Sequence, residues 1–276
     1  AGSVVGFLVD WYVVNPAAEI GELAPAVAGM FTGTYIGGSI NFNAVALHYK
    51  VNEAGNLFAA TTVVDNLIGT PWIIATLILP KYLQKWFPRK KLASAATAVK
   101  NDGIESISIS SLASILVLGL LGMTVSKVLV SYFPQVPEII FLTTLALILA
   151  QFPSVQQLYG KQTLGFFFIL IFLAVIGTLC VFRALAGVGS LAGTLRLCVG
   201  TMVLIHGAVI FGVGALFKMD WDVIAVASQA NVGGNTTAIA AAESLNRPDL
   251  LIPGVLVGSL GNAIGTYIGF AVAGML

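Results

Sequence analysis

Two adjacent glycines, Gly233 and Gly234, interrupt a hydrophobic segment that is long enough to cross a membrane. Each glycine inside a helix costs about 1 kcal/mol relative to alanine. A broken helix in lipid also leaves backbone N–H and C=O groups without partners, which is tolerated only where the break is buried in protein or lines a watery cavity. Polar side chains flank this pair, at Asn231 and at Asn235-Thr236-Thr237. The stretch therefore predicts a broken helix that is retained for a functional site.

A second hydrophobic segment has the same feature. Gly37 and Gly38 interrupt residues 24–47, as Gly233 and Gly234 interrupt residues 222–245. Two broken membrane segments in corresponding halves are the best sequence indication of a transporter's binding site.

The composition places the whole chain in a bilayer. Hydrophobic residues make up 58% of the sequence and charged residues 9%, whereas soluble domains carry about 25% charged residues. Since a crossing helix needs about 20 mostly apolar residues, we expect an all-α polytopic membrane protein. The expected spans, besides the two broken segments, are 56–80, 107–131, 137–155, 163–184, 193–217 and 250–276. Residues 1–14 form an apolar run without an initiator Met, and we expect a fragment whose first spans are missing.

One long polar stretch, residues 81–106, separates the spans and is rich in lysine and arginine. Such a stretch should be cytoplasmic. We therefore expect residues 1–80 to end a first transmembrane repeat, residues 81–106 to form a linker, and residues 107–276 to form a second repeat. Glu243, Arg247 and Asp249 are expected in a solvated loop.

An offset of 196 residues aligns the two broken segments without a gap. Gly37-Gly38 then falls on Gly233-Gly234, and the stretch 66–70 falls on 262–266 with Asn, Ile, Gly and Thr in common. This match predicts a duplicated bundle with two discontinuous, crossing helices. The span count favours parallel halves, but one span fewer would make them inverted, and the sequence leaves this open.

The breaks carry the residues that could bind a solute. The half-helix that resumes after each break presents free N–H groups and a partial positive charge, which suit an anion such as a carboxylate. Carbonyl oxygens that end the preceding half-helix suit a cation such as Na⁺. The predicted solute-binding residues are Gly37, Gly38, Ser39, Asn41, Asn231, Gly233, Gly234, Asn235, Thr236 and Thr237, with Asn43, Ser228 and Gln229 beside them. The alternative is that the glycines only let two helices pack closely.

Asp65 is a carboxylate about ten residues into its span, where an ionised group is costly unless it is paired, protonated or bound to an ion. We expect Asp65 and Asn66 to bind the coupling Na⁺ or H⁺, with capping of unwound backbone as the alternative for Asp65. Asn262 and Thr266 repeat the spacing of Asn66 and Thr70 and join the predicted ion-coupling set. We expect the helix faces that carry these residues to pack on the broken segments.

His206 is expected to be a hydrogen-bonded packing residue, with a proton relay as the alternative.

These stretches, together with 253–258 and 261–266, resemble the YjcL-like bacterial membrane proteins, domain-of-unknown-function family 819, over essentially the whole chain. That family is distantly similar to the cation:proton antiporter and anion transporter group. The resemblance implies a bacterial inner-membrane, multi-pass protein with crossed broken helices in a core that moves against a scaffold. Several antiporters of the group carry an Asn-Asp or Asp-Asp pair in the helix after the first crossing. Asp65-Asn66 has the reverse order, which puts its ion-binding role in question.

We therefore expect a secondary transporter that moves a small organic anion or amino-acid-like solute with Na⁺ or H⁺ by alternating access. The alternatives are a cation/proton antiporter without an organic substrate and a non-transporting scaffold or sensor. Enzyme motifs, metal-ligand spacing and a basic tract suited to nucleic acid are absent from the sequence. The expected partners are the lipid bilayer and the solute, a homodimer is allowed, and no cofactor is expected beyond the coupling ion.

Overall fold

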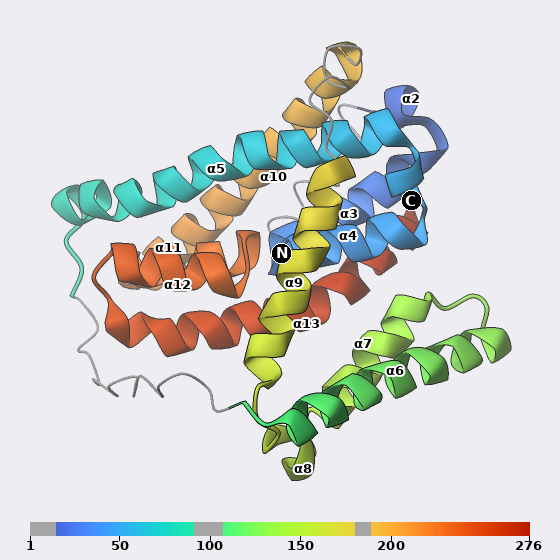
Figure 1. The fold of residues 1–276 in the computed structure, drawn as a ribbon. Helices are drawn as coiled ribbons and strands as arrows, with labels where there is room; N and C mark the ends of the chain where they lie inside the picture. Colours follow the sequence, from blue (N-terminus) through green and yellow to red (C-terminus); the bar gives the residue numbers. More distant parts are fainter. Residues whose placement is uncertain (1–14, 91–106, 180–188) are drawn as a thin grey trace. The chain divides into compact units, whose positions relative to one another are not determined.

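A computed structural model describes residues 15–90, 107–179 and 189–276, and these residues fold entirely into helices and their connections (Figure 1). The chain forms two compact units. One combines the described parts of residues 1–99 and 180–276, and the other comprises the described residues of 100–179. The predicted all-α class is therefore confirmed for the described residues.

Four helices among the described residues are long and apolar enough to cross a membrane. They are α5 (Gly55–Trp86), α6 (Ile109–Tyr132), α10 (Gly189–Leu216) and the stretch Pro248–Met275, which consists of η4 (Pro248–Leu250) and α13 (Leu251–Met275). Shorter elements are α2 (Ala17–Ile20), η1 (Gly21–Leu23), η2 (Val51–Glu53), α7 (Glu138–Leu149), α8 (Pro153–Gln156) and α9 (Lys161–Leu179).

Two expected span boundaries were wrong. Helix α5 continues through Pro71 and Pro80 to Trp86, so the linker expected from residue 81 begins as helix. A proline removes only one backbone donor, and membrane helices tolerate it where the freed groups find other partners. The span expected at 137–155 is instead the 12-residue α7 followed by a turn and α8, because Pro153 starts a new helix. Twelve residues rise only about 18 Å.

The two glycine-interrupted segments fold back on themselves. Hairpin 1 consists of α3 (Ala24–Gly37) and α4 (Ser39–His48), and hairpin 2 consists of α11 (Trp221–Val232) and α12 (Asn235–Ser244) (Figure 1). Asn41 on α4 packs on Gly33 of α3, and Thr237 on α12 bonds to Gln229 of α11. Contacts between residues eight apart require the chain to reverse. The expected pair of crossing helices that continue past their breaks is therefore replaced by two helical hairpins.

Glycine at the turn explains the reversal. Gly38 has φ 95° and ψ 175°, and Gly234 has φ 77° and ψ −154°. Side-chain-bearing residues rarely adopt this backbone region, whereas glycine enters it without steric cost. Helix α3 has 14 residues and rises about 21 Å, which is less than the roughly 30 Å core of a bilayer. Each hairpin therefore has the length to reach mid-membrane and return.

Helix α13 holds both hairpins through a face of small residues. Its Gly254 and Gly258 contact α11 and α12 of hairpin 2, while Gly261, Gly265 and Gly269 contact hairpin 1. A Cβ atom added to any of these glycines would crowd the facing hairpin, so the backbones can approach only because the side chains are absent. The base of hairpin 2 thus lies toward the start of α13 and the base of hairpin 1 toward its end. The two hairpins approach each other from opposite ends of this helix.

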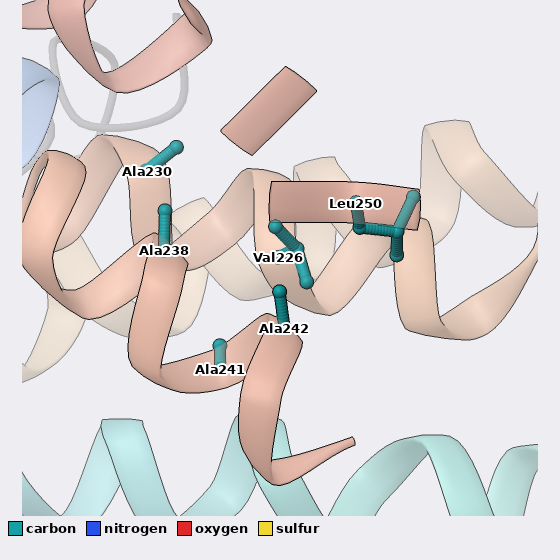
Figure 2. Packing of buried hydrophobic residues seen from close by; sticks show 6 residues of the cluster. All are labelled: Val226, Ala230, Ala238, Ala241, Ala242 and Leu250. Carbon is teal, nitrogen blue, oxygen red and sulfur yellow. The ribbon is translucent and has the colours of Figure 1, made fainter. Parts of the chain in front are cut away.

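Small apolar side chains join the two arms of hairpin 2. The cluster consists of Val226 and Ala230 on α11, Ala238, Ala241 and Ala242 on α12, and Leu250 (Figure 2). Alanine is the repeated component because the arms of such a tight hairpin leave little room between them.

Arg247 closes the base of hairpin 2. Its guanidinium bonds to Asp220 at 2.6 Å, to Asp222 at 3.0 Å and to Asp249 at 2.7 Å. Arg247 is 5% exposed, so the solvated loop expected for Arg247 and Asp249 was wrong at these two residues. The reason is that Asp220 and Asp222, at the start of α11, come from the other arm and provide the carboxylates that a buried arginine needs.

Candidate functional site

The tips of the two hairpins meet at their glycine pairs. A Cβ atom placed on Gly38 would lie 3.1 Å from the carbonyl oxygen of Gly233, and one placed on Gly234 would lie 2.9 Å from that of Gly37. The backbones of the two tips are therefore in direct contact. The structure brings together Gly37, Gly38, Gly233 and Gly234, four of the predicted solute-binding residues, from segments almost 200 residues apart.

Helices α4 and α12 both start at this junction. Neither start has a side-chain cap, since Gly38 and Gly234 occupy the N-cap positions. Ser39 and Thr236, in the first turns of the two helices, are exposed, and Asn235 is half-buried with its amide bonded to Ser259 at 3.0 Å. Two helix N-termini with uncapped N–H groups and accessible polar side chains thus start side by side, an arrangement that suits a negatively charged group.

Helix α13 adds two predicted residues to the junction. The hydroxyl of Thr266 donates to Oδ1 of Asn41 at 2.6 Å, and both side chains are buried. The amide of Asn262 lies beside Gly234, about where a side chain on that glycine would extend. Packing of Asn262 and Thr266 on the broken segments is therefore as expected. Thr266 secures hairpin 1, while Asn262 is placed at the contact between the tips.

Asp65 approaches the same region from α5. Its carboxyl group interacts electrostatically with the hydroxyl of Tyr35, which lies on α3 two residues before the glycine pair and is 1% exposed. Asn66 is exposed, and its side-chain amide bonds to the carbonyl of Thr62 in its own helix. The exposed Thr70 also lacks the expected packing. One helical position separates Asp65 from Asn66, and this turns the two side chains to different faces.

Asn231 and Thr237 complete the predicted set. Asn231 is half-buried and bonds to the carbonyl of Ala227 within α11. The hydroxyl of Thr237 lies 2.8 Å from the carbonyl oxygen of Gln229 and 3.2 Å from that of Gly234, so it stabilises the turn of hairpin 2.

A buried polar network joins α11 to its neighbours. The hydroxyl of Ser228 lies 3.0 Å from Nε2 of His206 on α10 and accepts a hydrogen bond from the indole of Trp72 on α5 at 3.1 Å. His206 is thus hydrogen-bonded and packed, as expected. The amide of Gln229 donates to Thr76 on α5 at 2.6 Å. Trp72 and Thr76 were not among the predicted site residues, although their spacings of 7 and 11 residues from Asp65 place all three on one helix face.

The site offers backbone N–H groups, amides and hydroxyls at the junction, and one carboxylate beside it. Among the described residues, no group of three or more His, Cys, Asp or Glu side chains is arranged to hold a metal ion. Such a mixture suits a small polar solute bound by hydrogen bonds and a monovalent cation or proton bound at Asp65.

Comparisons with known proteins point to membrane proteins of unknown function. Residues 1–276 match the family described as "Protein of unknown function (DUF819)". The chain is 30% identical over 292 residues to the uncharacterized membrane protein YjcL of Bacillus subtilis (strain 168), an alignment that covers 97% of this chain and 71% of the relative. No solved structure matches the chain.

Proposed function

Because the chain belongs to the DUF819 family of membrane proteins, whose description names no function, we propose from its own geometry that it is a secondary transporter. The cargo is a small organic anion or an amino-acid-like solute, and Na⁺ or H⁺ drives its movement. The protein would be a multi-pass component of the bacterial inner membrane.

The observation that carries the proposal is the contact between the two glycine-pair tips. The N-termini of α4 and α12 begin there without side-chain caps. Single uncapped helix starts also occur elsewhere among the described helices, at α5 and α6 for example. The distinguishing feature of this junction is that two such starts meet, so that their N–H groups and accessible polar side chains can serve one negatively charged group. A carboxylate in contact with both N-termini would satisfy these groups.

The opposed approach of the hairpins supports alternating access. Hairpins that reach the same junction from opposite ends of α13 give a site that either side of the membrane can open, as in transporters built from inverted repeats. We propose that the two halves are such a duplication, with the glycine-pair hairpins as corresponding elements. The span count that favoured parallel halves treated both broken segments and residues 137–155 as single crossings. Both segments reverse at their glycine pairs and α7 has only 12 residues, so that count no longer applies.

Asp65 supports coupling to a cation. It is a carboxylate on a membrane-length helix, and its partner Tyr35 belongs to the tip of hairpin 1. An ionisable group at this depth is a candidate ion or proton site by default. The same residue makes a cation/proton antiporter without organic substrate the second candidate.

A solute screen tests the proposal. The full-length protein is purified and its thermal denaturation is followed with organic acids, amino acids and peptides, at several Na⁺ concentrations and pH values. We expect at least one solute to raise the denaturation midpoint, since a ligand present at 100 times its Kd stabilises by about 2.7 kcal/mol. Cation flux in vesicles without any solute would favour the antiporter. If no solute raises the denaturation midpoint and no cation flux is seen in vesicles, a non-transporting scaffold or sensor becomes the remaining function.

A further inference from the structure

We propose that Gln229 is a positioning residue that couples the state of Asp65 on α5 to the tip of hairpin 2. This inference rests on the proposed function and goes beyond it, since it names the contact through which the ion and the solute would influence each other.

Gln229, on α11, is hydrogen-bonded to both α5 and α12. Its side-chain amide donates to Thr76 of α5 at 2.6 Å, while its backbone carbonyl accepts from the hydroxyl of Thr237 at 2.8 Å and from the N–H of Gly233 at 2.9 Å. Gln229 and Thr76 are 0% and 1% exposed. A displacement of α5 at Thr76 therefore acts directly on the residue that holds the turn of hairpin 2.

One face of α5 reaches both hairpins. Asp65, Trp72 and Thr76 are separated by 7 and 4 residues, which places them on one side of a helix with 3.6 residues per turn. Asp65 pairs with Tyr35 of hairpin 1, whereas Trp72 and Thr76 bond to α11 of hairpin 2. A cation or proton that changes the Asp65–Tyr35 pair thus acts on the helix face that contacts hairpin 2.

Stability alone is a poor explanation for the buried hydrogen bond between Gln229 and Thr76. The Oε1 atom of Gln229 is buried and has no hydrogen-bond donor among the described residues. An unmet buried acceptor costs about 1–3 kcal/mol, whereas two apolar side chains of the same shape avoid that cost. The Gln229–Thr76 bond therefore fixes the position of α11 against α5 more than it adds to the free energy of unfolding.

Hydrogen bonds of Ser228 make the Gln229–Thr76 contact testable, because they attach α11 to its neighbours without Gln229. Ser228 holds α11 through Trp72 and His206 independently of Gln229, and the ring of Trp72 lies against Gly207 of α10. Removal of the Gln229–Thr76 bond should consequently leave hairpin 2 docked and the protein folded.

The test follows hairpin 2 while only the cation is changed. The full chain, with Cys180 and Cys198 replaced by alanine, carries an environment-sensitive fluorophore on Ala240→Cys, an exposed position of α12 outside the junction. The protein is titrated with NaCl, against choline chloride, and separately with pH. We expect a fluorescence change in the parent and its loss in Asp65→Asn, Gln229→Met and Thr76→Val. Thr76→Ser keeps the hydroxyl and should retain the change.

Gln151→Met is the matched control, because Gln151 is exposed and its side-chain amide bonds, among the described residues, only to the carbonyl of Leu147 in the preceding turn. It should behave like the parent. A parental response that persists in Gln229→Met and Thr76→Val would overturn the inference, as would a parent that responds to neither Na⁺ nor pH. The transporter proposal is decided separately, by the solute screen on the unlabelled protein. Should Gln229→Met not fold, the Thr76→Val and Thr76→Ser pair decides the question.

Discussion

Gly38 and Gly234 lie at the meeting tips of two helical hairpins, each with a positive φ angle, 95° and 77° respectively. Each is also in contact with the backbone of the opposite glycine pair. Both demands, a left-handed backbone and the absence of a side chain, fall on the same residues. The junction therefore depends on glycine for two independent reasons.

Gly38→Ala and Gly234→Ala should each destabilise the protein. A side-chain-bearing residue in this backbone region costs about 1–3 kcal/mol before any contact with the opposite tip is counted. The midpoint of thermal denaturation in detergent measures the effect. Gly200→Ala is the control, because Gly200 lies inside α10 with open space around its Cα atom. That variant should be neutral or slightly stabilising, and an equal loss there would contradict the special role of the tips.

Thr266→Val should weaken the attachment of hairpin 1 to α13. Valine has nearly the shape of threonine but cannot donate to Oδ1 of Asn41, which would then be buried without a donor. The expected cost is about 1–3 kcal/mol, measured as a lower denaturation midpoint. Thr266→Ser keeps the hydroxyl and should retain most of the stability. If valine and serine behave alike, the hydrogen bond is not what holds the hairpin.

Asp65→Asn should remove the ion dependence of solute uptake in proteoliposomes. Asparagine can still accept a hydrogen bond from Tyr35, but it can neither take up a proton nor neutralise a cation. Uptake driven by a Na⁺ or pH gradient should fall to the level seen without a gradient, while the protein still enters the membrane. Asn66→Leu, at the exposed neighbouring position, serves as the comparison and should keep the gradient dependence. Full uptake by Asp65→Asn with unchanged ion dependence would remove Asp65 from the coupling mechanism.

Arg247→Met should open the base of hairpin 2. The hydrogen bonds that Arg247 donates to Asp249, and then those to Asp220 and Asp222, raise the pKa of Arg247 above its ordinary value. Because the pKa is higher in the folded protein, the charged Arg247 stabilises the fold fully at any pH below its unfolded pKa. This stabilisation is lost only as the pH rises through the higher folded pKa. Arg247 thus stays charged at every pH at which the protein can be handled. The loss of stability caused by Arg247→Met should therefore be the same at neutral and at alkaline pH.

The expected loss for Arg247→Met is about 3–5 kcal/mol, because the remaining carboxylates would be buried without their cation. Lys218→Met provides the control, since the exposed Lys218 is close in sequence but outside the cluster. A loss for Arg247→Met no greater than the control's would show that the buried cluster does not stabilise the hairpin.

Much of the fold and part of the site could be predicted from the sequence. Hydrophobic runs of the right length predicted α6, α10 and α13 to within a few residues, because the length of a membrane helix follows from bilayer thickness. The same reasoning misjudged the ends of α5 and α7, since neither the tolerance of Pro80 nor the break at Pro153 follows from hydropathy. Asp65 could be singled out because a carboxylate in an apolar span is costly wherever it points.

The sequence by itself determined that this chain is an all-helical membrane protein with two glycine-interrupted segments, since composition and backbone freedom are local properties of the residues. Only the tertiary structure decided that each interruption reverses the chain, that Gly38 meets Gly234, and that Asp65 interacts with Tyr35 while Asn66 is exposed. Those outcomes depend on which backbones can approach α13 and on the rotation of α5 about its axis. Both are set by packing between segments far apart in the chain, which no local pattern records.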